Sequence, residues 1–229
     1  MMLVLGVDVE TTGLSTTEDE IIELGAVVWD TDTNKPVAMI NHLVKQPQKG
    51  KLSKTIINIT GITDTDIESF GINEEVVINE FNDLSKKCQY IVAHNGNQFD
   101  KCFIDKAAAR YGIKINTPWL DTMLDVPYNC STKKLTYLAA EHDFLNPFSH
   151  RALFDVLTML TICSKYDWKN IAKRSSSPVV TVIAKVSKEN RHLAKSKNFR
   201  WDPVNVRWIK NIKQCDLDVS NFDFEYDIE

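Results

Sequence analysis

The pattern of apolar and polar positions begins with strands and changes to helices further along the chain. Three apolar segments rich in valine and isoleucine, at 3–9, 21–29 and 37–44, have the length of β-strands. Only short polar stretches separate them. We therefore expect these three strands to form an antiparallel meander.

Beyond residue 73 the apolar positions take a helical period, with Val76, Val77, Phe81 and Leu84 on one face. Strands and helices then alternate, with expected bounds of 90–93 for a strand, 99–111 for a helix, a strand ending near 120, and helices at about 133–142 and 150–166. This order predicts an α/β fold, a mixed sheet flanked by helices, over residues 1–172.

The remaining residues suggest a second, smaller unit. Three serines and Pro178 mark residues 173–178 as a linker. A strand at 179–186, a helix at 188–198 and a hairpin at 199–210 follow, so we expect a small αβ module over 179–213. Residues 214–229 are acidic, and we expect them to be disordered.

Charge is distributed unevenly although the whole chain carries only −4. Residues 173–213 hold eleven basic and two acidic side chains, residues 214–229 hold six acidic and no basic ones, and residues 1–172 carry −7. A basic module on an acidic body predicts a polyanionic partner at the module. The aromatic rings of Phe199, Trp201 and Trp208 in this module are placed to stack on nucleic-acid bases. The alternative, which we favour for at least one tryptophan, is that these rings form the core of the module.

Composition excludes several classes of protein. The five cysteines are odd in number, widely spaced and without a C-x-x-C pair, which argues against a disulfide framework and a structural zinc site. No apolar run approaches the ~20 residues of a membrane helix, and the N-terminus lacks the basic region of a signal peptide. These features predict a reduced, cytoplasmic protein with no membrane partner.

The first candidate site residues are Asp8 and Glu10, which share one face of a predicted strand because side chains alternate. An unpaired carboxylate in so apolar a strand is costly, and a hard cation with oxygen ligands would compensate it. The alternative is a solvated strand end, which explains the pair equally well. Asp223 and Glu225 have the same spacing in polar surroundings.

Two further segments combine histidine with aspartate. A polar loop from His94 leads to Asp100 in the first turn of a helix, where aspartate is also a common helix-start residue. His150 and Asp155 are five residues apart, so on one continuous helix they would lie ~140° apart. We therefore place His150 on the loop or the first helical position and Asp155 inside the helix.

Together these segments resemble the DEDDh branch of the ribonuclease H-like 3′→5′ exonucleases, over about residues 1–166. The family's first motif stands as Asp8-Val9-Glu10-Thr11-Thr12-Gly13-Leu14. Its second appears as His94-Asn95 and Phe99-Asp100, with three residues in a gap where two are commoner, and its third as His150 and Asp155. Thr60-Gly61-Ile62-Thr63 also resembles a family feature.

The resemblance implies a metal-dependent mechanism. It implies two Mg²⁺ ions, or Mn²⁺, held by Asp8, Glu10, Asp100 and Asp155, with Asp8 between the ions. His150 would be the general base, a task suited to an imidazole with an ordinary pKa of ~6.5. Substrate-binding roles fall to these residues: Thr11 at the 3′ end, Leu14 as a wedge against the last base, and His94, Asn95 and Phe99 along the pocket. Leu14 and Phe99 have the alternative role of core residues.

The function implied is release of nucleoside 5′-monophosphates from the 3′ ends of single-stranded DNA. An exoribonuclease of the same fold is one alternative. A non-catalytic nucleic-acid-binding protein is another, although the presence of all five catalytic side chains argues against it. Further partners suggested are a polymerase, or a sliding clamp bound through Gln214-x-x-Leu217. The acidic tail could also cover the basic module as a mimic of nucleic acid.

Overall fold

The computed structural model describes residues 2–46, 50–130 and 132–229. The chain forms two compact units, residues Met1–Ile171 and Ala172–Glu229, which we describe separately. No helix in the described parts of the chain is long and apolar enough to cross a membrane.

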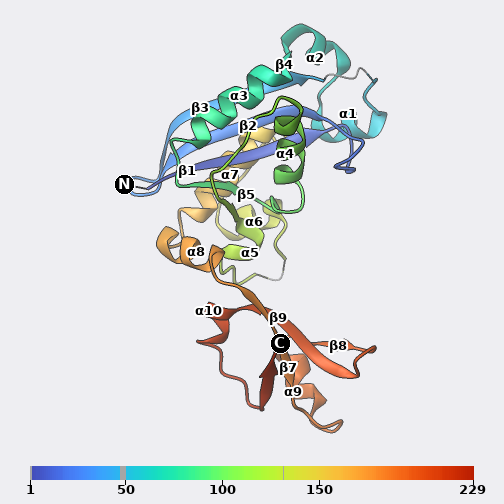
Figure 1. Cartoon of the computed structure of the whole chain (residues 1–229), viewed down its shortest axis with the longest axis vertical. Coiled ribbons are helices and arrows are strands. Elements are labelled where there is room, and N and C mark those ends of the chain that lie inside the picture. Colours follow the sequence, from blue (N-terminus) through green and yellow to red (C-terminus); the bar gives the residue numbers. More distant parts are fainter. Residues whose placement is uncertain (1, 47–49, 131) are drawn as a thin grey trace. The chain divides into compact units, whose positions relative to one another are not determined.

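The sheet of the first unit has six strands in the order β4-β3-β2-β1-β5-β6 (Figure 1). β1 (Leu3–Thr11), β2 (Ile21–Asp30) and β3 (Lys35–Lys45) pair antiparallel, which confirms the predicted meander. The other three strands pair in parallel with their neighbours, β5 (Tyr90–Ala93) with β1, β6 (Trp119–Asp121) with β5, and β4 (Ile72–Asn73) with β3. The mixed α/β sheet expected from the sequence is therefore confirmed.

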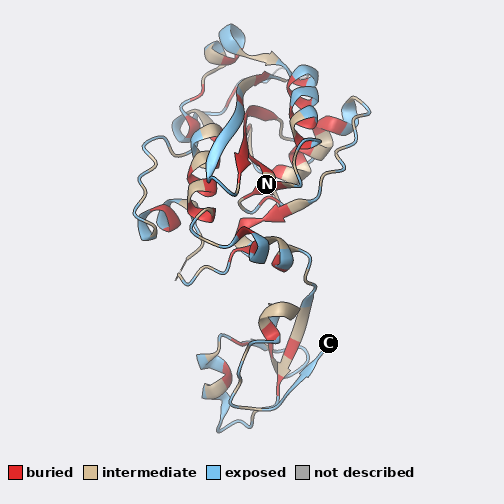
Figure 2. Cartoon of the chain, turned by 90° about the vertical axis from the view of Figure 1, so that its left-hand side faces the viewer, coloured by how far each residue is buried: buried red, intermediate tan, exposed pale blue. Residues whose placement is uncertain are grey.

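Helices cover both faces of this sheet. α3 (Glu74–Ser85) and α4 (Asp100–Arg110) pack on one face, where Phe81 and Phe103 meet Leu5, Val7 and Val9 of β1. α7 (Ala152–Cys163) packs on the other face against Val4. Buried residues accordingly follow the strands and the inner sides of the helices (Figure 2). The even-numbered positions of β1 thus face α7, which decides where its carboxylates lie.

The described residues of this region also form five shorter helices: α1 (Lys54–Thr60), α2 (Asp64–Phe70), α5 (Thr122–Asp125), α6 (Leu135–Glu141) and α8 (Trp168–Ser175). α8 crosses the boundary between the two units. Residues 173–175, expected as part of a linker, are instead its last turn. Arg174 there is 9% exposed and forms an ion pair with Asp216, so this part of the linker prediction is wrong.

The second unit has a four-stranded sheet in the order β10-β7-β9-β8. Its elements are β7 (Val179–Ala184), α9 (Arg191–Ser196), β8 (Arg200–Asp202), β9 (Arg207–Lys213), α10 (Gln214–Leu217) and β10 (Tyr226–Ile228). The strand, helix and hairpin that we predicted form most of this unit.

The acidic segment 214–229 is part of this fold, which contradicts the prediction of a disordered tail. β10 pairs antiparallel with β7, and Phe222 and Phe224 pack against Phe199 of the module. Leu217 is 3% exposed within the same core. The structure therefore also contradicts a sliding-clamp peptide at Gln214-x-x-Leu217, because Leu217 already packs inside the unit.

Candidate active site

Asp8 and Glu10 lie on the face of β1 that α7 covers. Gly25 of β2 pairs directly with Asp8 across the antiparallel ladder. A Cβ at Gly25 would lie 2.4 Å from the backbone nitrogen of Leu153, in the first turn of α7. Glycine is thus required at this position, because only a bare backbone lets the start of α7 approach the Asp8 strand so closely.

Glu23, two residues before Gly25, fixes that helix start. Its carboxylate is buried and accepts hydrogen bonds from Arg151 Nη2 at 2.8 Å and from the Ala152 backbone nitrogen at 3.0 Å. One buried side chain thus binds a guanidinium and one of the helix's otherwise unpaired N–H groups. Glu23 was not predicted, although a glutamate inside an apolar strand is the same signal that identified Asp8 and Glu10.

Asp155 lies in the first turn of α7, and His150 precedes the helix, as predicted. The His150 backbone nitrogen donates to Asp155 Oδ2 at 2.8 Å, and Asn146 Nδ2 donates to Asp155 Oδ1 at 2.7 Å. His150 adopts a φ of 64°, a left-handed conformation that few residues other than glycine take. The turn is therefore held by its hydrogen bonds to Asp155, and the exposed imidazole remains beside that carboxylate.

Asp100 is the first residue of α4, which packs on the face of the sheet opposite to α7. It is 2% exposed, and its Oδ1 accepts a hydrogen bond from the Val9 backbone nitrogen at 3.0 Å. Val9 lies between Asp8 and Glu10 in the sequence. This hydrogen bond therefore holds Asp100 against the strand segment that carries both other carboxylates.

The loop between β5 and α4 is organised by Asp121, another residue that the sequence analysis missed. Its buried carboxylate accepts hydrogen bonds from the backbone nitrogens of Asn95 and Asn97, both at 3.1 Å. Asn95, which we expected to line the pocket, is exposed and is not among the lining residues. The Asn95 backbone instead holds the loop through its hydrogen bond to Asp121, and it adopts a left-handed φ of 66°.

His94 lines the cavity but is already engaged on both ring nitrogens. Nε2 lies 2.7 Å from the Lys133 carbonyl oxygen, so Nε2 carries a hydrogen, and Nδ1 lies 2.7 Å from Thr122 Oγ1. Burial lowers the pKa of His94, which favours the neutral ring. His94 therefore shapes the wall, and His150 is the histidine of the site whose ring is exposed.

An open cavity of about 710 Å³ lies at this site, and the buried Asp100 is not among the residues that line it. Of the predicted site residues, eight line it: Asp8, Glu10, Thr11, Leu14, His94, Phe99, His150 and Asp155. Leu14 is 85% exposed, whereas Phe99 packs against Phe103. Ile56 and Ile59 of α1 and Lys134 also line the cavity, and none of them was predicted.

The electrostatics of the site favour a bound cation. Burial, followed by the neighbouring Asp100 and Glu10 carboxylates, raises the pKa of Asp8 well above its usual value. Burial also raises the pKa of Glu10 to about 8, that of Asp100 to about 7, and that of Asp155. Within the described residues, no lysine or arginine forms an ion pair with any of the four.

Divalent metal ions fit this donor set. Atoms of Glu10, His150 and Asp155 that can bind a metal lie within 4.8 Å of one another. Hard divalent cations prefer carboxylate oxygens, and they lower the electrostatic cost of burying several acids together. The four carboxylates would hold the metal.

We expect the metal-free protein to lose stability as the pH rises. Between its ordinary pKa of 4.5 and the folded-state value of about 8, Glu10 is protonated in the folded protein and ionised when unfolded, so stability falls across this interval. Thermal unfolding in EDTA from pH 5 to 9 should show a falling Tm. Divalent ion at ~100 times its Kd adds ~2.7 kcal/mol, or about 5–10 °C.

Glu10→Gln is the matched variant, because it keeps the shape of the side chain and removes its charge. It should flatten the pH dependence in EDTA and reduce the gain from added ion. A wild-type Tm that is independent of both pH and divalent ion would contradict a cation site at these carboxylates.

Comparison with known proteins agrees with this geometry. A family model described as exonuclease matches residues 5–163, and a second, described as a domain of unknown function (DUF8626), matches residues 180–227. The protein named DNA polymerase III PolC-type of Staphylococcus haemolyticus is 36% identical over 153 residues, 65% of this chain and 10% of that protein. Its namesake from Caldanaerobacter subterraneus is 37% identical over 116 residues, 51% of this chain and 8% of that protein.

The chain thus spans about a tenth of the length of these curated relatives. Among solved structures, E. coli exonuclease I with single-stranded DNA and bound zinc has a TM-score of 0.66 at 15% identity, covering 81% of this chain and 48% of that one. The same enzyme with a dA16 oligonucleotide has a TM-score of 0.65 with the same identity and coverage. These similarities establish the fold.

The exonuclease model matches more than half of the chain, over the residues that build the carboxylate site. Members of this family typically use divalent metal ions. The mixed six-stranded sheet flanked by helices matches the fold of exonuclease I. The chain belongs to the DEDDh-type 3′→5′ exonuclease family of enzymes.

Proposed function

We propose that this protein removes nucleoside 5′-monophosphates from the 3′ ends of single-stranded DNA by a two-metal mechanism. One observation supports this most strongly. Three carboxylates from β1 and α7 line one cavity beside an exposed histidine, and Asp100 of α4 is buried next to them, hydrogen-bonded to the Val9 backbone. None of the four forms an ion pair with a basic residue among the described residues. Asp8, Glu10, Asp100 and Asp155 would hold two Mg²⁺ ions, with Mn²⁺ as a substitute.

Such ions, when bound, supply an activated water and stabilise the charge that develops on the phosphate. The chain itself would position the proton acceptor. His150 would take the proton from the attacking water, and the hydrogen bond from its backbone to Asp155 keeps its ring beside Glu10 and Asp155. Asn146 restrains the other oxygen of Asp155, so the turn has little freedom to move away.

The substrate would enter between β1 and α1. Thr11 is buried, and its hydroxyl donates to the Gly13 carbonyl oxygen, which shapes the turn that would receive the terminal nucleotide. Leu14 is exposed at the cavity, where its side chain would wedge against the last base. His94 and Phe99 would form the wall, and Lys134 brings a positive charge to the same cavity.

We favour single-stranded DNA as the substrate because of the proteins that this chain resembles. The curated relatives are called DNA polymerases, and exonuclease I was crystallised with single-stranded DNA. The same names support, as part of the proposal, association with a polymerase. The five cysteines form no disulfide, in keeping with a reducing cytoplasmic setting.

Degradation of matched DNA and RNA oligonucleotides under identical conditions tests the choice of substrate. We expect the DNA strand to shorten from its 3′ end at least several-fold faster than its RNA twin. Faster shortening of the RNA would identify an exoribonuclease. Binding of both strands without shortening of either would identify a non-catalytic protein.

A further inference from the structure

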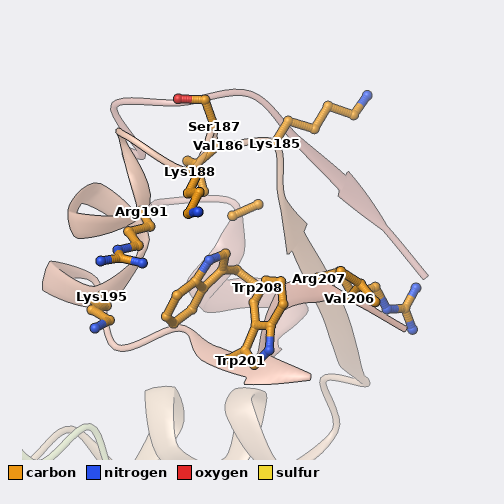
Figure 3. A pocket seen from close by; sticks show the side chains of 11 residues that line it. Lys185, Val186, Ser187, Lys188, Arg191, Lys195, Trp201, Val206, Arg207 and Trp208 are labelled. Carbon is orange, nitrogen blue, oxygen red and sulfur yellow. The ribbon is translucent and has the colours of Figure 1, made fainter. Parts of the chain in front are cut away.

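The second unit contains a pocket of its own, of about 850 Å³. Basic side chains and aromatic rings line it together: Lys188, Arg191 and Lys195 with Trp201 and Trp208. Figure 3 shows the three basic side chains on one side of the Trp208 ring, whereas Lys185 and Arg207 point away from it.

The acidic C-terminal segment forms ion pairs with some of the basic residues of this unit. Four ion pairs join it to the module: Arg174–Asp216, Lys185–Asp227, Lys197–Asp223 and Arg207–Glu229. In the part of the chain that the structure describes, no ion pair involves Lys188, Arg191 or Lys195. The segment therefore does not cover the whole module as a mimic of nucleic acid, and three basic side chains that line the pocket stay outside its ion pairs.

The two tryptophans have different roles. Trp208 packs partly against the core of the unit. Trp201 is 45% exposed although it is one of the largest apolar side chains, and its ring lies 5.4 Å from that of Trp208 at 59°. Lys195 Nζ lies 5.8 Å from the centre of the Trp208 ring. An exposed indole next to unpaired cations is poorly explained by packing alone, because Trp208 already fills the core position.

We propose that this pocket binds an unpaired stretch of a nucleic-acid strand, at a site separate from the carboxylate cavity. A base would stack on Trp201, and adjacent phosphates would contact Lys188, Arg191 and Lys195. A ligand with phosphates but no bases would need only the basic side chains of the pocket. An apolar ligand would need only its tryptophan rings. The combination fits a strand whose bases are exposed, and paired bases inside a duplex would not reach the indole.

This site would supply an attraction that the first unit lacks. Residues 1–172 carry −7 and so repel a polyanion at long range. The phosphate contacts in the pocket would hold the strand on the same chain as the carboxylate cavity.

Equilibrium binding in EDTA tests the proposal on the full chain, because the strand stays intact and the result does not depend on the proposed nuclease activity. Anisotropy of a 5′-labelled dT20 would be measured at several salt concentrations. Each phosphate contact on a single strand adds ~0.7 to the slope of log K against log salt. Replacing Lys188, Arg191 and Lys195 by Ala should therefore flatten the slope by ~2 units.

The matched control replaces Lys169, Lys173 and Arg200 by Ala, which removes the same number of exposed positive charges outside the pocket. Its slope should stay within ~0.7 of wild type. Trp201→Ala should weaken binding about tenfold or more, whereas Trp201→Phe, which keeps a ring, should retain most of the affinity. Equal slopes for the two triple variants, or full affinity in Trp201→Ala, would overturn the proposal. So would a single nucleotide that competes as well as the strand.

Discussion

Asp8→Asn should reduce hydrolysis by about 10³-fold or more while the protein stays folded. Metal coordination contributes several kcal/mol of transition-state stabilisation, and each 1.36 kcal/mol corresponds to a tenfold change in rate. Asparagine keeps the shape of the side chain and removes its charge. The release of nucleotide from a labelled DNA strand in Mg²⁺ measures the effect.

The same substitution should raise the Tm of the protein in EDTA, because burial and the surrounding acids make a charged Asp8 unfavourable. A variant that is inactive but more stable without metal distinguishes loss of a metal ligand from damage to the fold. Asp83→Asn on α3 is the matched control, since Asp83 is exposed and far along the chain from the site. Activity of Asp8→Asn within a few-fold of wild type would contradict the role of this carboxylate.

His150→Ala should lower kcat by ~10²–10⁴-fold, the usual contribution of a positioned acid or base. The effect on metal binding must be measured as well, because a ring nitrogen of His150 lies close enough to Glu10 and Asp155 to bind a metal itself. If His150 is the base, the rise in Tm on adding divalent ion should persist in the variant.

Loss of that metal-induced rise together with activity would instead make His150 a ligand. His192→Ala is the control, because His192 is exposed and belongs to the second unit. A His150→Ala enzyme with nearly full kcat would mean that the histidine is not needed in the reaction.

The meander and the main helices were predictable because their burial is periodic. β1 alternates between the two faces, so the positions of Asp8 and Glu10 follow from the sequence. α1 and α2 were missed because helices of seven residues contain too few turns for a clear period. The start of α2 did carry a signal, a capping box between Thr63 and Asp66.

The C-terminal segment was misjudged because its average charge concealed its pattern. Acidic residues occupy every second position from Asp223 to Glu229, and Phe222, Phe224, Tyr226 and Ile228 occupy the alternate positions. This is the period of a strand. Phe222 and Phe224 join the core of the unit, and the acids between them pair with its basic residues.

Within the site, the residues that carry charge were predictable and those that position them were not. Glu23, Gly25 and Asp121 act through contacts between segments distant in the sequence, Glu23 with Arg151 and Asp121 with Asn95. Such contacts depend on how β2 and β6 lie next to α7 and the 94–99 loop, which a single sequence does not specify. Asn95 was misplaced for the same reason.

The most direct test of the account is the direction and metal dependence of strand shortening. A single-stranded DNA labelled at its 5′ end would be incubated with the protein in Mg²⁺ and, in parallel, in EDTA. We predict a ladder of 5′-labelled products, each shorter by one nucleotide, together with nucleoside 5′-monophosphates in Mg²⁺, and an intact strand in EDTA. A labelled mononucleotide as the first product, or equal degradation in EDTA, would contradict a metal-dependent 3′→5′ exonuclease at this site.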